Sequence, residues 1–455
     1  MMTKSVSPVT KNDVKQAIRR GLGRGYLAAR NDPERYRDLV LWACGRNLAF
    51  DTQCEGTRAW YDYQLILCYS DRAAFRDHVI ERFQRKQPDG GWDYSHFSEL
   101  LSYFAEDGDG AAEAALWEKY KELLAALHSF RRASRRMRNT IDCFESLCLA
   151  LSWKEANYSR IAADVGGLFL KSRLYDGWDF EWLYDSRPKP FNQRLRKAAD
   201  QSAELSAYLA AIDEHQRTMD GWKNTPRVTP IPESGRRLSG YLKRSAPELA
   251  PKYAEIYLAA EDPEARAAAL EAFVICPYPL DPSPVITDAR SAHPALRSAA
   301  LKALSGIRHP AVRDFAWALL ANDPDNALPI AIKNYLPKDE ARLNAMLQAY
   351  RVDYACKSNW HWLHWAIFDL FGKDSGVESP PKSLLPLVYE TTLCSCCRET
   401  AARLMGRYRM MTPELWEEQL YDSNDDIRRA AQAHFRRTSC SGENDRHIQV
   451  PLKKN

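Results

Sequence analysis

The stretch EDPEARAAALEAF (261–273) sets the pattern for the C-terminal half of this 455-residue chain. Similar stretches follow at 292–304 (AHPALRSAALKAL), at 308–320 (RHPAVRDFAWALL) and, further on, at 423–435 (SNDDIRRAAQAHF). Most begin with a turn or capping residue and a proline, carry an arginine about three residues later, and end in Leu or Phe after small residues. A capping side chain satisfies free amides at a helix start, and proline needs no amide partner there. Each stretch therefore predicts a short helix.

The spacing of these prolines predicts how the helices are arranged. Pro263, Pro294 and Pro324 lie 31 and 30 residues apart, about the length of two helices and their turns, and Pro310 opens the helix midway between the last two. Small residues let a neighbouring helix approach closely, and leucines fill the seam between helix pairs. One pair cannot bury its apolar face alone, but stacked repeats share a continuous core. We expect an all-α fold, a superhelical array of antiparallel helix pairs.

This pattern resembles the HEAT repeat, a family of α-solenoids. The resemblance is clearest over 247–345, weaker over 383–436, where CSCCRETAARLM (394–405) fits loosely, and only generic over 1–235. In that family, an acid at the turn within one repeat and an arginine in the second helix form a ladder between neighbouring repeats. The resemblance assigns the ladder positions to Asp262, Asp323 and Asp425 and to Arg266, Arg297, Arg398 and Arg428. His293 and Ser395 stand where an acid is expected, so the ladder is interrupted, and we interpret its arginines as structural.

The N-terminal half has helical periodicity of a less regular kind. The proline-rich stretch NTPRVTPIPESG (224–235) disfavours helix and is typical of a connector between two arrays. We therefore expect an irregular helical array over 1–235, a HEAT-like array over 236–440 and a polar tail over 441–455. Helices expected in the first array include 11–30, 33–46, 55–69, 71–86, 111–130, 139–152 and 154–172, and a polar, charged helix is expected between SRPKPF (186–191) and the connector.

Composition excludes several classes of protein. The 45% hydrophobic share is enough for a sizeable core, which excludes a wholly disordered chain. No apolar run approaches the roughly 18 residues that a bilayer span needs, and the N-terminus has no apolar segment typical of a secretory signal. The 64 basic and 60 acidic side chains are too balanced to indicate a polyanion partner by themselves. Eleven cysteines, an odd number in mostly apolar surroundings, predict free buried thiols, and together these features predict a cytoplasmic protein.

The sequence contains no strong catalytic signature. It lacks a Walker-type phosphate loop, a GxSxG elbow, an HExxH motif and paired CxxC motifs, so no catalytic residue, metal or cofactor is assigned. Cys394 and Cys397 are separated by two residues, but no adjacent histidine and no second pair completes a zinc knuckle, which favours ordinary thiols. Whether the protein is an enzyme stays open, and the pattern favours a non-enzymatic role.

The densest aromatic segment is NWHWLHWAIFDLF (359–371). One interpretation is a groove that stacks a ligand; another is a metal site formed by the two histidines and Cys356, although a fourth ligand is missing. The interpretation that we favour is a bulky helix buried on several sides. The candidate ligand-binding residues are Trp360, His361, Trp362, His364 and Trp365.

Two basic segments, RRASRRMR (131–138) and GRRLSGYLKR (235–244), are candidates for nucleic-acid binding. A solvated face balanced by nearby acids is the alternative, and the modest net charge of +4 favours it. The candidate residues are Arg131, Arg132, Arg135, Arg136, Arg138, Arg236, Arg237, Lys243 and Arg244.

From the repeats we expect a non-enzymatic scaffold or adaptor that holds a partner protein on a long, rigid surface. This step rests on analogy between folds. The alternative is a nucleic-acid-binding protein similar to the HEAT-type alkylpurine DNA glycosylases, whose catalytic motif has no match here.

Overall fold

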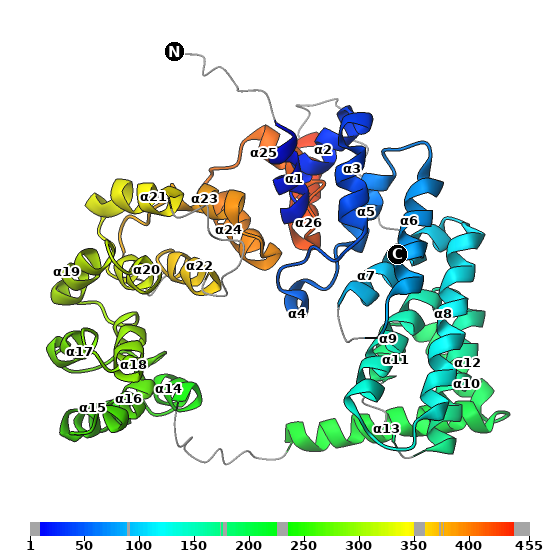
Figure 1. The fold of residues 1–455 in the computed structure, drawn as a ribbon, viewed down its shortest axis with the longest axis horizontal. Coiled ribbons are helices and arrows are strands. Elements are labelled where there is room, and N and C mark those ends of the chain that lie inside the picture. Colours follow the sequence, from blue (N-terminus) through cyan, green and yellow to red (C-terminus); the bar gives the residue numbers. More distant parts are fainter. Residues whose placement is uncertain are drawn as a thin grey trace. The chain divides into compact units, whose positions relative to one another are not determined.

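The computed structural model describes residues 10–88, 92–172, 174–175, 180–224, 235–349, 360–372, 375 and 377–440. These residues form helices and connecting turns, with no β-strand among them, which confirms the predicted all-α fold (Figure 1). No helix in the described ranges is long and apolar enough to cross a membrane.

The chain forms two compact units. The first contains Met1–Pro226, Leu393–Cys396 and Met411–Asn455, and the second contains Arg227–Thr392 and Cys397–Met410. The sequence had placed one boundary at residue 235 and had assigned everything from 236 to 440 to a single array. The structure instead groups 411–440 with the N-terminal helices, while the tail at 441–455 lies outside the described residues.

The first unit is built from helices that contact one another in chain order. Helices α1, α3, α5, α7 and α9 form one such series, α6 packs against α8, and α10 packs against α13. The helices of this unit are α1 (Lys11–Arg20), α2 (Gly23–Asn31), α3 (Pro33–Cys44), α4 (Thr52–Glu55), α5 (Ala59–Ile66), α6 (Arg72–Arg85), α7 (Trp92–Glu106), α8 (Gly110–Ser129), α9 (Arg135–Leu151), α10 (Glu155–Lys171), α11 (Glu181–Asp185), α12 (Lys189–Ala199), α13 (Ala203–Asn224), α25 (Pro413–Gln419) and α26 (Asp425–Cys440).

Helix α7 was not among the predicted helices. Its buried side contains His96, Ser98 and Ser102 next to apolar residues such as Leu100 and Phe104. Polar residues on the buried face blur the apolar periodicity by which an amphipathic helix is recognised. The predicted helix at 11–30 is also divided, because Gly21 has a left-handed φ of 71° and ends α1.

The C-terminal helices α25 and α26 complete the first unit, with α25 packed against α2. The Tyr26 and Tyr421 rings stack with centroids 4.4 Å apart. A Cβ added at Gly23 would lie 1.8 Å from the carbonyl oxygen of Glu418, so only glycine permits this approach of the two backbones. The match between these surfaces explains why 411–440 belongs to this unit, although its sequence resembles the repeats of the other.

The second unit contains helix pairs that follow one another along the chain. Helices α15, α17 and α19 each pack against the next helix, and α16, α18, α20 and α22 contact one another in that order (Figure 1). The helices are α14 (Gly235–Arg244), α15 (Ala250–Ala259), α16 (Pro263–Leu270), α17 (Ser283–Asp288), α18 (Pro294–Leu304), α19 (Pro310–Leu319), α20 (Pro324–Lys333), α21 (Glu340–Ala349), α22 (Trp360–Asp369), α23 (Leu384–Thr391) and α24 (Ser395–Arg407), which begins with two residues of the first unit.

The predicted helix starts of this unit are confirmed. Pro263, Pro294, Pro310 and Pro324 each occupy the first position of a helix. The side chain of His293 accepts a hydrogen bond from the Leu296 amide at 3.4 Å, so it caps α18 where an acid was expected. The small residues at 267, 299 and 300 and the leucines at 270, 301 and 304 are buried, as the predicted seam between helices requires.

Candidate functional site

Arginines three residues after the helix-opening prolines form ion pairs across the second unit. Arg297 on α18 contacts Asp323, the cap of α20, at 3.1 Å, so this pair joins two of the expected ladder positions. Arg313 on α19 contacts Asp339 at 2.5 Å, a pair that the sequence did not predict. Each pair fixes the distance between helices that are separated along the chain.

The other expected ladder residues have different partners. Arg266 contacts Asp288, at the end of α17, at 2.6 Å. The Tyr257 hydroxyl donates a hydrogen bond of 2.6 Å to the same carboxylate. Asp262 accepts a hydrogen bond from the Ala265 amide at 2.9 Å and thus caps its own helix. The expected ladder is therefore replaced here by a local tyrosine–arginine–aspartate cluster.

Two further ladder arginines belong to later helices. In the first unit, Arg428 pairs with Asp425 of its own helix at 2.8 Å, and its guanidinium lies 3.5 Å from the centroid of the Trp60 ring. Arg398, on α24, is fully buried. Both side chains are thus held inside the protein, which agrees with a structural role for these arginines.

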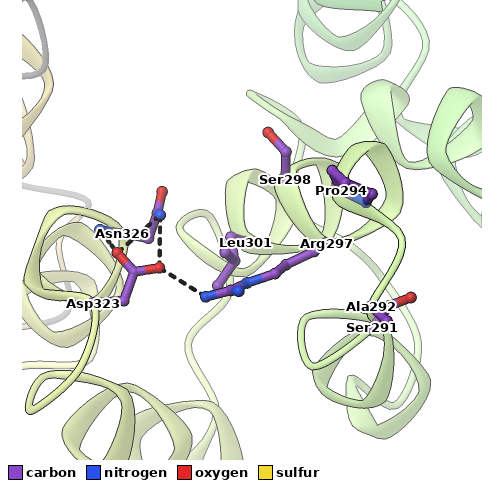
Figure 2. A pocket seen from close by; sticks show the side chains of 8 residues that line it. All are labelled: Ser291, Ala292, Pro294, Arg297, Ser298, Leu301, Asp323 and Asn326. Atoms are coloured by element: carbon purple, nitrogen blue, oxygen red, sulfur yellow. Dashed lines mark hydrogen bonds and ion pairs between the residues drawn. The ribbon is translucent and has the colours of Figure 1, made fainter.

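A surface pocket lies beside the Arg297–Asp323 pair, where α18 and α20 begin (Figure 2). Its volume is about 380 Å³. Asn326 donates hydrogen bonds to both carboxylate oxygens of Asp323, at 3.1 and 3.0 Å, on one side of it. A pocket lined mainly by short polar side chains suits hydrogen bonding to a polar group of a ligand or partner. The lining residues are Ser291, Ala292, Pro294, Arg297, Ser298, Leu301, Asp323 and Asn326.

A second polar cluster is enclosed in the first unit, where α3, α5 and α7 meet. Asp62 and His96 are fully buried, with Oδ2 and Nε2 3.5 Å apart, and their side-chain oxygens and nitrogens have no hydrogen-bond partner. Burial raises the pKa of Asp62 well above its usual value, and the charge of Arg58 only partly opposes this. Burial also lowers the pKa of His96 to about 4. Both groups are therefore favoured in their neutral forms.

Cys44, at the end of α3, is electrostatically linked to this pair. Burial raises the pKa of the Cys44 thiol well above its ordinary value. A cysteine, a histidine and an aspartate are the residue types of a nucleophilic triad. All three are 0% exposed, however, so no substrate reaches them, and a buried neutral thiol is inert. No sequence pattern indicated this cluster. The only local sign was the presence of polar residues within the apolar stretches WYDYQLIL and SHFSELL.

The aromatic segment at 360–365 lies on α22, and two of its candidate residues are described in full. His364 is buried, and its Nδ1 lies 3.5 Å from the Thr392 hydroxyl. Trp365 is 58% exposed, and its ring packs against the edge of Phe368. The structure therefore places these neighbours in different environments. The side chains of Trp360, His361 and Trp362, and the whole of Cys356, lie outside the described residues.

Metal-binding geometry is not found in the described part of the chain, where no group of three or more His, Cys, Asp or Glu side chains could hold an ion. Cys394 and Cys397 are buried and Cys396 is half-buried; all three are free of disulfide bonds. In this part of the molecule, the structure offers no ligand set for the zinc alternative.

The five arginines of the first basic segment are all exposed, and they lie at the turn between α8 and α9. Helix α9 begins at Arg135, so Arg135 and Arg136 stand in its first turn. In the second basic segment Arg237, Lys243 and Arg244 are exposed on α14, and the side chain of Arg236 lies outside the described residues.

A scan against protein-family models matches no family, and a search of curated proteins finds no match. Functional inference for this chain therefore rests on its own contacts. Two surface features bear on it: the pocket beside Arg297 in the second unit and the arginine-rich turn before α9 in the first.

Proposed function

We propose that this protein is a cytoplasmic, non-enzymatic scaffold whose second unit is a HEAT-like α-solenoid that binds a partner protein. The observation that carries this proposal is the order of helix contacts. Each of α15, α17 and α19 pairs with the helix that follows it, and α16, α18, α20 and α22 contact one another in sequence. Stacked helix pairs create long surfaces, whose usual role is to hold another polymer.

The ion pairs between helices support a rigid surface. The Arg313–Asp339 pair is mostly buried, with 19% and 8% of its side-chain areas exposed, and the Arg297–Asp323 pair is more open, at 46% and 20%. A pair that is largely shielded from solvent has a defined geometry and resists displacement of its helices. The surface is therefore largely formed before a partner binds, which lowers the entropic cost of association.

The pocket beside Arg297 is the most specific contact point for a partner. Ser298 and Asn326 present exposed polar groups at its rim, while Ala292 and Pro294 supply exposed apolar area. Interfaces between proteins often concentrate binding free energy where an anchoring side chain enters such a depression. We propose that one polar side chain of the partner occupies it. The enclosed Cys44, Asp62 and His96 give no support to an enzymatic alternative, because all three are fully buried.

The test is cross-linking of the tagged chain in cells of its source organism, followed by mass spectrometry, with a variant that fills the pocket. Ser298→Tyr is expected to abolish cross-links from α18 and α20 to one stoichiometric protein. Ala295→Tyr is the matched control, because Ala295 is exposed on the same helix but does not line the pocket. Circular dichroism and thermal unfolding of both variants verify that the helices are intact.

Two outcomes contradict the proposal. Equal cross-linking by wild type and Ser298→Tyr excludes the pocket as the contact point. Recovery of partners that depends entirely on nucleic acid, shown by their loss after nuclease treatment, excludes direct protein binding by this unit.

A further inference from the structure

The connection between α8 and α9 and the start of α9 concentrate positive charge that no acid in the described part of the chain neutralises. This region contains four arginines within the six residues 131–136, and all four side chains are exposed. Within the part of the chain that the structure describes, none of these guanidinium groups has a hydrogen bond, an ion pair or a ring contact. The four residues, called the arginine turn below, are Arg131, Arg132, Arg135 and Arg136.

Some other arginines at the surface of the first unit have acidic partners, although the exposed Arg436 and Arg437 have none among the described residues. Arg76 contacts Asp109 and Arg196 contacts Asp213, each at 2.7 Å. Acids near the arginine turn in sequence are already engaged: Glu122 contacts Lys119 at 2.8 Å, and Asp142 interacts electrostatically with Arg138. These two acids therefore do not neutralise the arginine turn.

The position of these charges is also unfavourable by itself. Arg135 and Arg136 occupy the first turn of α9, where the helix dipole is positive and cations destabilise. The Ser134 hydroxyl accepts a hydrogen bond from the Met137 amide at 3.1 Å, so this helix start is capped without help from the arginines. Four neighbouring like charges repel one another as well. Because no contact among the described residues offsets this cost, an external anion is the partner that would.

We propose that the arginine turn binds the phosphate backbone of duplex nucleic acid. Guanidinium groups match phosphate oxygens in bidentate geometry, and several side by side suit a row of phosphates. Between the arginines stand only Ala133 and Ser134, and Met137 is buried. The adjacent ring, Phe130, is half-buried against the core of the unit, so the turn offers no fully exposed aromatic ring for the bases of a single strand and no large exposed apolar side chain for insertion into a bilayer.

Binding by this turn is independent of base sequence, because contacts to phosphates position a protein without reading bases. Three extended residues followed by the first turn of a helix span roughly 10 Å of backbone, so the long side chains reach about three or four phosphates. The site lies in the first unit and is separate from the proposed protein-binding surface of the second. The two proposals therefore stand or fall independently.

The experiment is fluorescence anisotropy with a labelled duplex of roughly 20 base pairs, titrated with the full chain from about 50 to 200 mM salt. For wild type, log K is expected to fall against log salt with a slope of about −3 to −4, since each neutralised phosphate contributes about 0.9. In the variant R131Q/R132Q/R135Q/R136Q, affinity is expected to fall at least tenfold at low salt and the slope to move close to zero.

A control variant removes the same charge elsewhere. Arg85, Arg217, Arg403 and Arg429 are 65–78% exposed and pair with acids three or four residues away on their own helices. Changing these four to Gln is expected to leave affinity within a factor of about three and to preserve the slope. Circular dichroism confirms folding of both variants.

The proposal is overturned if the arginine-turn variant binds duplex like wild type, or if the control variant loses affinity equally, which would show a general effect of net charge. Vesicles containing anionic lipid serve as a competing polyanion. They are expected to leave the duplex complex intact, and displacement of the duplex at equal charge concentration would assign the turn to a membrane surface instead.

Discussion

The backbone amide of Ser423 donates a hydrogen bond to the carbonyl oxygen of Gly21 at a distance of 2.8 Å. The bond joins the turn after α1 to the turn before α26, two segments at opposite ends of the sequence. Arg58 lies beside both, because its guanidinium donates to the Arg20 carbonyl at 2.9 Å and to the Ser423 hydroxyl. The first unit is thus completed by residues that lie far along the chain from its N-terminal helices.

Replacement of Gly21 by Ala is expected to destabilise the first unit strongly. A Cβ at this position would lie 1.8 Å from Nη1 of Arg58 and 2.1 Å from Oγ of Ser423, in addition to the strain of a φ of 71°. We expect a loss of about 3 kcal/mol or more in the free energy of unfolding, measured by urea denaturation.

Gly108→Ala separates the strain of a positive φ from the steric clash of an added Cβ. Gly108 also follows a helix and has a positive φ of 93°, but a Cβ there meets nothing within 4 Å. Its replacement is expected to cost only about 1 kcal/mol, the price of the left-handed backbone. Equal losses in both variants would contradict the close approach of α26 to Gly21.

Arg58→Met is expected to destabilise the protein because it isolates a buried carboxylate. Arg58 and Glu55 have side chains that are 3% and 2% exposed, and they form an ion pair of 2.8 Å. Loss of one partner of such a pair typically costs about 3 to 5 kcal/mol. The double variant with Glu55→Gln is expected to recover part of the lost free energy of unfolding, measured by thermal and urea denaturation, whereas strictly additive effects would exclude the coupling.

The control is Arg85→Ala, which breaks an exposed pair with Glu81 and is expected to cost less than about 0.5 kcal/mol.

The Asp62–His96 pair is expected to shape the pH dependence of stability. In the folded chain the pair holds one proton on Asp62, whose pKa is raised, while the pKa of His96 is lowered to about 4. In the unfolded chain, between pH of about 4 and 6.5, the pair also holds one proton, but on the histidine. The pair therefore contributes nothing to the pH dependence of the free energy of unfolding between pH of about 4 and 6.5. Above about pH 6.5 the unfolded histidine releases its proton, and for as long as the raised pKa of Asp62 keeps the folded carboxyl protonated, stability falls as pH rises.

Asp62→Asn tests this assignment. The variant leaves only the lowered pKa of His96, so the unfolded state binds more protons between pH 4 and 6.5. Its free energy of unfolding is expected to rise by about 3 kcal/mol between pH 4 and 6.5. Above pH 6.5 it is expected to stay constant, without the fall that is expected for the wild type. Groups near the pair are Arg58 on α5, Cys44 on α3 and Asp93 on α7, and they are unchanged in the variant. Identical pH profiles for wild type and variant, measured by urea unfolding, would falsify the neutral buried pair.

The ion pairs of the second unit are expected to differ in strength according to their burial. Arg297→Ala should cost less than about 1 kcal/mol, because the pair with Asp323 is open to solvent. Arg313→Ala should cost about 1 to 3 kcal/mol, because it leaves the Asp339 carboxylate, only 8% exposed, without its guanidinium partner. Thermal unfolding of the two variants compares them directly, and the reverse order would contradict a role for burial.

The local sequence predicted the helices of the second unit well, since the signals act over a few residues. A proline after a capping residue marks a helix start whatever the surroundings, as at Pro263 and Pro310. A run of small residues such as Ala299 and Ala300 predicts close packing for the same reason. Helix α7 was missed because His96 and Ser98 face the core, where the periodic pattern expects apolar residues.

Candidate sites were harder to predict because they depend on contacts between distant residues. The clustering of the arginines was evident from the sequence. That they are exposed, and that the nearby acids Glu122 and Asp142 interact with other residues, was known only from the structure. The pocket beside Arg297 was not predicted, since its walls come from two helices. Nor did any pattern connect Cys44, Asp62 and His96, which stand on three separate helices.

The sequence by itself determined that the chain is helical, where several of its helices begin, and that small residues and leucines of the second unit, such as Ala300 and Leu304, are buried. These properties follow from backbone sterics, capping and periodicity, which act between near neighbours. Only the tertiary structure decided that residues 411–440 complete the first unit, that Arg266 pairs with Asp288, and that Asp62 meets His96 in a sealed core. Each of these depends on the fit between surfaces far apart in the chain. Helical periodicity predicts which face of a helix is apolar, but it does not predict which other helix packs against that face.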